Sequence, residues 1–144
     1  MRLFLFLWAG LLIAGEHGTK AEYIGGTLEQ VKAGSDIRLL LTDASVMGID
    51  SKEEFLKIPY SQINQIEYGQ KVSRNIVPAI VISPLFLLNK TRKHFLTLGF
   101  LDQKGNQQAL VLRVGKGNIR ALLASLEART GQKVQYLDPE SRKL

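Results

Sequence analysis

Cysteine is absent from this sequence of 144 residues, and histidine occurs only twice. The lack of cysteine excludes disulfide bonds, iron–sulfur clusters, thiolate zinc sites, a cysteine nucleophile and a lipid-modified cysteine at a leader junction. His17 lies in the N-terminal leader discussed below, so His94 alone cannot form a histidine metal cluster. Its neighbours Lys93 and Phe95 indicate the start of a strand rather than a general base. We therefore expect a protein that is not an enzyme and has no catalytic residue, metal or cofactor.

Acidic side chains are also absent from one long stretch, between Tyr68 and Leu101. Five basic residues in that stretch bracket the apolar run from Ile76 to Leu88, and they are Lys71, Arg74, Lys90, Arg92 and Lys93. If residues 1–21 are removed, this stretch accounts for the whole excess of positive charge. Such local charge indicates a contact zone and not a nucleic-acid binder, since no aromatic platform is interleaved with the bases. We expect no nucleic acid as a partner.

Length and composition fit one domain with one hydrophobic core. Hydrophobic residues make up 45% of the chain and charged residues 22%, which is ordinary for a globular protein. Without disulfides, the core alone must hold the domain together.

The N-terminus has the features of an export signal. Arg2 gives a positive start, Leu3 to Ala14 is apolar, and small residues follow. The 12 apolar residues fall short of the roughly 20 that span a bilayer, which favours a cleaved signal peptide over an uncleaved anchor. We predict a signal peptide over residues 1–21 with cleavage after Ala21, and cleavage near Ala14 or Gly15 is the alternative. The protein is then exported to the periplasm or cell envelope.

Short strands separated by polar turns are expected after the leader. The predicted strands are Tyr23 to Gln30, Ile37 to Thr42, Val46 to Ile49, Glu54 to Ile58, Asn64 to Gln70, His94 to Leu101 and Gln107 to Val114. The last two form a hairpin around the Gly-containing loop Asp102 to Asn106. Between Pro59 and Tyr68 the spacing also fits a helical face, and we favour a tight turn at Ser61 and Gln62 before a strand.

One amphipathic helix is expected near the C-terminus. Ile119, Leu122, Leu123 and Leu126 recur at helical spacing, Asn118 is the predicted N-cap, and Gly131 is the predicted left-handed C-cap. A short strand over Val134 to Leu137 follows, and the charged tail, residues 138–144, is expected to be frayed.

The order of these elements and several of their residues resemble bacterial pleckstrin-homology-like and GRAM-like domains. The resemblance covers residues 22–137, and its motifs are Phe55-Leu56-Lys57-Ile58-Pro59-Tyr60, His94-Phe95-Leu96-Thr97-Leu98, the Asp102 to Asn106 loop and the closing helix. In that superfamily an Ile-Pro-Tyr step leads from the third strand into the next sheet, and the helix caps one open end of the barrel. The resemblance implies a mainly β fold with one C-terminal α-helix, an antiparallel barrel or sandwich of about seven strands.

The chain departs from the phosphoinositide-binding members of that superfamily. Those members carry a basic cluster between their first two strands, whereas the corresponding stretch here, Val31 to Asp36, has one lysine and one aspartate. A phosphoinositide site is therefore not expected, and the basic residues lie instead in an insertion over residues 71–93.

This basic-apolar insertion has three possible roles. Two prolines, Pro78 and Pro84, interrupt the apolar run, so it is too short to span a membrane and fits an interfacial segment whose bases meet anionic headgroups. It could equally be a strand and a turn that complete the core, or a segment that fills a groove on a partner protein. The predicted contact residues are Lys71, Arg74, Ile76, Val77, Ile80, Val81, Leu85, Phe86, Leu87, Leu88, Lys90, Arg92 and Lys93.

These observations predict an exported, non-catalytic binding or scaffold module. Its expected partner is an anionic membrane surface, which it contacts through the basic-apolar insertion. The alternative is a protein-interaction domain whose insertion binds an envelope protein or a second copy of the chain.

Overall fold

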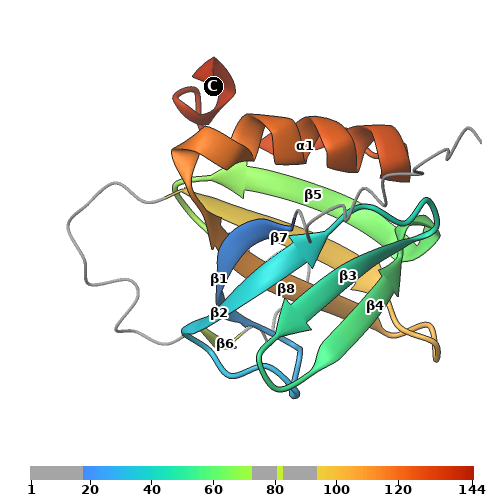
Figure 1. The fold of residues 1–144 in the computed structure, drawn as a ribbon. Helices are drawn as coiled ribbons and strands as arrows, with labels where there is room; N and C mark the ends of the chain where they lie inside the picture. Colours follow the sequence, from blue (N-terminus) through green and yellow to red (C-terminus); the bar gives the residue numbers. More distant parts are fainter. Residues whose placement is uncertain (1–17, 73–80, 83–93) are drawn as a thin grey trace, which may run out of the picture.

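The computed structural model describes residues 18–72, 81–82 and 94–144. In these ranges the chain is mainly β, with one α-helix near the C-terminus (Figure 1). The strands are β1 (Thr19–Gly26), β2 (Ser35–Leu40), β3 (Val46–Ser51), β4 (Phe55–Pro59), β5 (Ile63–Gly69), β6 (Val81–Ile82), β7 (Phe95–Leu101), β8 (Gln107–Val114) and β9 (Val134–Tyr136), and the helix is α1 (Lys116–Thr130). The predicted fold class, mainly β with one C-terminal helix, is confirmed.

The strands form one sheet in the order β4-β3-β2-β1-β8-β7-β5-β9, and β6 pairs with β1 outside this path. Every pairing is antiparallel except that of β9 with β5, which makes the sheet mixed. Among the described strands, β4 and β9 end the order and do not pair with each other. The described sheet is therefore not closed into a barrel, and the parallel β5–β9 pair departs from the otherwise antiparallel order that was expected. The chain crosses from β8 to β9 through α1, a connection that allows parallel pairing with β5.

The sheet curls so that β2, β3 and β4 lie over β5, β7 and β8, and α1 covers the top of this arrangement (Figure 1). One cluster of buried side chains is shared by both halves of the sheet and the helix. Among its least exposed members are Leu39, Met47, Ile49, Ile66, Leu98, Leu110, Ile119 and Leu126. Burying these apolar side chains supplies the main stabilisation that a protein without disulfides needs.

Strands β1, β7 and β8 are buried on both faces. A second, smaller cluster consists of Ile24, Phe95, Ala109 and Val111, with Val72 packed against it. Side chains of alternate residues along a strand point to opposite faces, so Leu110 and Leu112 contribute to the large cluster while Ala109 and Val111 contribute to the small one. Burial on both faces explains the near-continuous apolar character of β7 and β8.

The predicted turn and hairpin are confirmed. A 3-10 helix over Tyr60–Gln62 leads into β5, so the helical alternative for this stretch is wrong. In the loop between β7 and β8, the carboxylate of Asp102 accepts backbone hydrogen bonds from Lys104 at 2.9 Å and Asn106 at 2.8 Å. Gly105 adopts a φ of +79°, a conformation that glycine permits without steric cost.

Helix α1 begins earlier than predicted. Gly115 is its N-cap and makes no side-chain capping bond, so the prediction of Asn118 as N-cap is wrong, since Asn118 lies in the first turn. Gly131 is confirmed as the left-handed C-cap, with φ 72° and its N–H donating to the Glu127 carbonyl at 2.9 Å. In the described part of the chain, no helix combines the length and apolarity needed to cross a membrane.

The first strand also begins earlier than predicted. Strand β1 starts at Thr19 and not at Tyr23, because Thr19 and Lys20 pair with Leu39 and Arg38 of β2. It ends at Gly26, where φ is +142° and the backbone passes too close to the Ala109 carbonyl to leave room for a side chain. Residues 1–17, which contain most of the predicted signal peptide, lie outside the described residues.

The C-terminal tail is attached to β5, so the expectation of a frayed end is wrong. The Asp138 carboxylate accepts a hydrogen bond from the Gln70 backbone N–H at 2.7 Å. It also accepts hydrogen bonds from the N–H and hydroxyl of Ser141, which is fully buried. A β-carbon on Gly69 would come within 2.7 Å of both Asp138 and Leu137, so glycine is what allows the tail to approach this closely.

Candidate functional site: a charged groove beside β1

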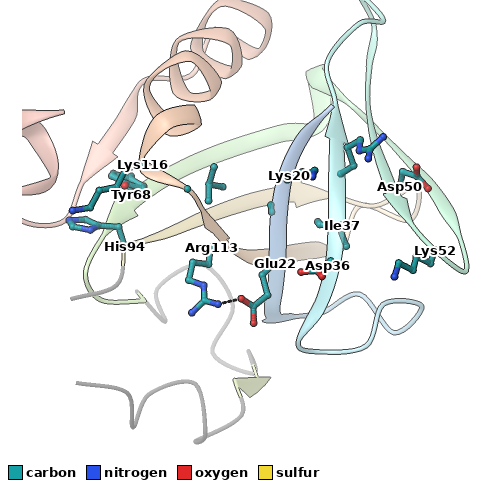
Figure 2. Close-up of a pocket in the computed structure, with 14 residues that line it drawn as sticks. Lys20, Glu22, Asp36, Ile37, Asp50, Lys52, Tyr68, His94, Arg113 and Lys116 are labelled. Carbon is teal, nitrogen blue, oxygen red and sulfur yellow. Dashed lines mark hydrogen bonds and ion pairs between the residues drawn. The ribbon is translucent and has the colours of Figure 1, made fainter. Parts of the chain in front are cut away.

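A groove of about 650 Å³ lies beside β1, between the start of α1 and the turn after β3. Its charged lining residues are Lys20, Arg38, Lys52, Arg113 and Lys116, which are basic, and Glu22, Asp36 and Asp50, which are acidic. Figure 2 shows Tyr68, His94 and Lys116 at one end, Arg113 and Glu22 in the middle, and Asp50 and Lys52 at the other end. The bases outnumber the acids, so the groove as a whole favours an anionic ligand.

Tyr68 and His94 form the first end of the groove. Their rings stack with centroids 5.5 Å apart and planes 17° apart. Tyr68 is only 2% exposed and lines the groove. Burial raises the pKa of Tyr68, and the nearby Asp138 and Tyr136 raise it further. The hydroxyl therefore keeps its proton at neutral pH and can donate a hydrogen bond into the groove.

Arg113 and Glu22 form an ion pair in the middle of the groove. The two residues face each other across the β1–β8 pairing, and Nη2 of Arg113 contacts Oε2 of Glu22. The side chain of Arg113 is 37% exposed, so its charge reaches the solvent of the groove. A guanidinium has five N–H donors, so one contact with Glu22 leaves donors for a second acceptor.

The N-terminal turn of α1 closes this side of the groove. Gly115 and Lys116 line it, and the first turn of the helix contains no acidic residue. A β-carbon on Gly115 or Gly117 would meet no atom within 4 Å, so both glycines leave open space around the helix start. The positive end of the helix dipole and the Lys116 ammonium are thus presented together.

The structure describes only two of the predicted contact residues. Lys71 is exposed just after β5, and Val81 belongs to β6, which pairs with Gly25 and Gly26 of β1. The predicted contact residues outside the described ranges are Arg74, Ile76, Val77, Ile80, Leu85, Phe86, Leu87, Leu88, Lys90, Arg92 and Lys93. At Val81 and Ile82 the insertion therefore joins the sheet as a strand. For these two residues, this pairing agrees with the alternative in which a strand of the insertion completes the core.

Sequence reasoning missed the groove because its lining comes from five strands, the start of one helix and two positions outside these elements, which are distant from one another in the chain. One signal was present in the stretch Gly115-Lys116-Gly117, which has some likeness to a phosphate-binding loop. It lacks the full motif spacing, and a turn leading into a helix explains it sufficiently at the sequence level.

No protein-family model matches the chain, and no curated protein matches its sequence. In residues 18–72, 81–82 and 94–144, no group of three His, Asp or Glu side chains is arranged to hold a metal ion.

Proposed function

We propose that the protein is a non-catalytic binding module of the pleckstrin-homology-like superfamily, exported to the periplasm or cell envelope. It docks on an anionic membrane surface through the basic-apolar insertion. Two features support the superfamily assignment. The Ile58-Pro59-Tyr60 step connects β4 to β5, which lies in the opposite half of the sheet, and α1 follows the last antiparallel strand. Both are features that the resemblance implies.

The pairing of β5 with β7 is the observation that carries the docking proposal. Gly69 pairs with Phe95, so Lys71 lies two residues beyond a paired position and Lys93 two residues before its partner. The two basic flanks of the insertion therefore leave the sheet from adjacent strands. Close to an anionic bilayer each base contributes about 1 kcal/mol, and apolar side chains between them add burial in the interface.

The groove supplies further positive charge near the strands that flank the insertion. Lys116 lies at the end of the groove beside His94, the residue before β7, whereas Arg113 lies in the middle of the groove and is paired with Glu22 (Figure 2). An anionic surface that meets the flanks of the insertion would also meet these side chains, which favours a membrane over an uncharged protein partner.

Sedimentation with vesicles tests the proposal. The protein is expressed from its full-length gene and purified in the form that the cell produces. It is then mixed with phosphatidylglycerol vesicles or with phosphatidylcholine vesicles. The test variant replaces Lys71, Arg74, Lys90, Arg92 and Lys93 with glutamine. The control variant makes the same five-charge change at exposed residues outside the groove, and these are Lys32, Lys57, Lys104, Arg120 and Lys133.

We expect the native protein and the control to sediment with phosphatidylglycerol only, and salt to weaken this binding because it screens exposed charges. The test variant should bind at least about 100-fold more weakly, since it loses five contacts of about 1 kcal/mol each. Equal loss in both variants, or no sedimentation with either lipid, would show that the proposal is wrong. A concentration-dependent oligomer or the capture of one envelope protein would then favour the partner-binding alternative.

A further inference from the structure

Strand β4 forms one edge of the sheet, and among the described strands it pairs with β3 alone (Figure 1). Two hydrogen bonds at its ends show which backbone groups this pairing uses. The N–H of Ser51 donates to the Glu54 carbonyl at 2.9 Å, and the N–H of Tyr60 donates to the Ser45 carbonyl at 3.0 Å. Every second residue of an antiparallel strand bonds to the same neighbour, so positions 54, 56, 58 and 60 are directed to β3. Positions 55, 57 and 59 therefore direct their backbone groups to the free edge.

The free edge of β4 offers donors and acceptors to another strand. Phe55 and Lys57 each present an N–H and a carbonyl, whereas Pro59 has no N–H and presents a carbonyl only. The turn before the strand holds this edge in place, because the Ser51 hydroxyl donates to the Glu54 carbonyl and accepts from the Glu54 N–H, both at 3.0 Å. A row of backbone groups of this kind is a template for strand pairing.

An exposed aromatic ring adjoins this edge. Phe55 is 51% exposed, more than any other large apolar side chain in the described part of the chain. Its ring lies against Gly48 of β3, where a β-carbon would come within 2.9 Å of it. The ammonium of Lys57 lies 6.0 Å from the ring centroid. The sheet thus positions an aromatic side chain, of a type enriched where protein surfaces meet, beside unused backbone donors.

A second copy of β4 matches this edge in one register. Two antiparallel copies related by a two-fold axis at Leu56 place Phe55 of each copy opposite Lys57 of the other. All four outward N–H groups, two from each copy, then donate to carbonyls of the other copy. Each ammonium meets the exposed ring of Phe55 and the acidic turn residues Glu53 and Glu54 that precede it. Charge complementarity therefore favours a second copy as the occupant of this edge.

Other registers use the edge less well. A two-fold axis at Lys57 would place two ammonium groups opposite each other, which is destabilising. An axis at Phe55 would align Lys57 with Glu53, which lies in the turn and not in the strand. An axis at Ile58 would align Lys57 with Pro59 and leave the N–H of Phe55 without an opposite residue in β4. The register described above is thus the one that uses every outward N–H without opposing like charges.

We propose that the free edge of β4 is a homodimer interface, in which two copies of the chain pair antiparallel about Leu56 and extend the sheet across a two-fold axis. One strand pair buries less than the about 1,200–2,000 Å² of a standard interface, so we expect a weak dimer with a Kd of about 10–100 µM. The interface lies outside the basic-apolar insertion and does not depend on membrane docking. Vesicle assays at about 1 µM protein contain mainly the monomer, so changes at Phe55 or Lys57 leave docking unaffected.

Cysteine cross-linking tests the register. The native chain has no cysteine, so each single-cysteine variant reports on one position. In Leu56→Cys the two copies of the residue form a non-hydrogen-bonded pair, with β-carbons about 4.5–5.5 Å apart, so oxidation at about 100 µM protein should give a disulfide-linked dimer. The controls Phe55→Cys and Lys57→Cys each face a different residue of the other copy and should cross-link at least about fivefold less. Any other order of yields, including equal yields or none, would overturn the proposal.

Sedimentation velocity measures the dimer without cross-linking. Native protein, expressed from its full-length gene, is compared with two variants from about 1 to about 500 µM. Lys57→Ala removes the ammonium and keeps the N–H, so we expect dimerisation to weaken about fivefold. Lys57→Pro also removes the outward N–H, which an edge strand tolerates where that group faces solvent, and it should weaken dimerisation at least about fiftyfold. A monomeric native protein at the highest concentration, or equal effects of the two variants, would overturn the proposal.

The variant with five glutamines in the basic-apolar insertion separates this interface from self-association through the insertion. We expect that variant to dimerise like the native protein. A dimer that disappears in it and persists in Lys57→Pro would overturn the β4 interface. If the native protein binds anionic vesicles but stays monomeric, the docking proposal stands and the dimer proposal fails.

Discussion

At the scale of single residues, Gly69 illustrates how the C-terminal tail is held. Its missing side chain lets Leu137 and Asp138 approach β5, and an added β-carbon would come within 2.7 Å of each. Gly69→Ala should therefore destabilise the protein by about 1–3 kcal/mol through overpacking. Chemical denaturation measures this change. Gly117→Ala is the matched control, because its β-carbon meets nothing within 4 Å and alanine favours a helix. An equal loss of stability in both variants would contradict the account.

Asp138 makes the attachment of the tail sensitive to pH. Desolvation raises the pKa of this carboxyl, but hydrogen bonds from Gln70 and Ser141 together lower it below its ordinary value of 3.8. A lowered pKa in the folded protein means that the stabilisation is complete above the ordinary value and is lost as the pH falls through the lower, folded value.

The corresponding prediction concerns amide exchange. Asp138→Asn should accelerate hydrogen exchange of the Gln70 and Ser141 amides about fivefold at neutral pH, which corresponds to roughly 1 kcal/mol, because a neutral amide oxygen is a weaker acceptor than a carboxylate. Exchange of the Leu98 amide, in the centre of the sheet, serves as the internal reference. Unchanged protection of Gln70 would contradict the role of Asp138.

At the scale of elements, the first residues of β1 bear on where the predicted signal peptide would be cleaved. Cleavage after Ala21 would remove Thr19, Lys20 and Ala21, which pair with Leu39, Arg38 and Ile37 of β2. Ala21 is also part of the core, with 8% exposure. Strand β1 therefore favours the upstream alternative at Ala14 or Gly15.

If the chain is exported and cleaved as proposed above, we accordingly predict an N-terminus upstream of Thr19, and intact-mass measurement of protein purified from the cell envelope reads it directly. A mass that begins at Glu22 would contradict this prediction. An engineered chain that begins at Glu22 should be less stable than one that begins at Gly18, because it loses three paired residues of β1.

Much of the element order could be predicted because local patterns determine it. The alternation of Phe55 and Lys57 with Leu56 and Ile58 predicted β4, and the Gly-containing loop after Leu101 predicted the β7–β8 hairpin. The ends of β1 and α1 were missed for physical reasons. Pairing with β2 extends β1 beyond its apolar residues, and Gly115 caps α1 without the polar side chain that marks a typical N-cap.

The groove could not be predicted, because its residues meet only through strand pairing and curvature of the sheet between segments far apart in the chain. Glu22 and Arg113 are 91 positions apart in the chain, and Tyr68 and His94 are separated by the whole basic-apolar insertion. Parallel pairing of β9 with β5 was missed for the same reason, since nothing local in Val134 to Tyr136 indicates its partner.

At the scale of the whole molecule, β5 and β7, the adjacent strands that precede and follow the basic-apolar insertion, adjoin the groove through Tyr68 in β5 and His94 just before β7. The protein also offers a convenient experimental property, since it contains no cysteine. A single introduced cysteine can therefore carry a fluorescent label at one chosen position.

Label fluorescence on vesicles tests membrane docking most directly. Phe86→Cys, labelled with a dye whose emission shifts to the blue in apolar surroundings, is mixed with phosphatidylglycerol vesicles. The matched control is Phe55→Cys, labelled at a side chain that is 51% exposed on β4. The account predicts a blue shift at position 86 that requires anionic lipid and is reversed by salt, with little change at position 55. No shift at position 86, or equal shifts at both positions, would contradict docking through the basic-apolar insertion.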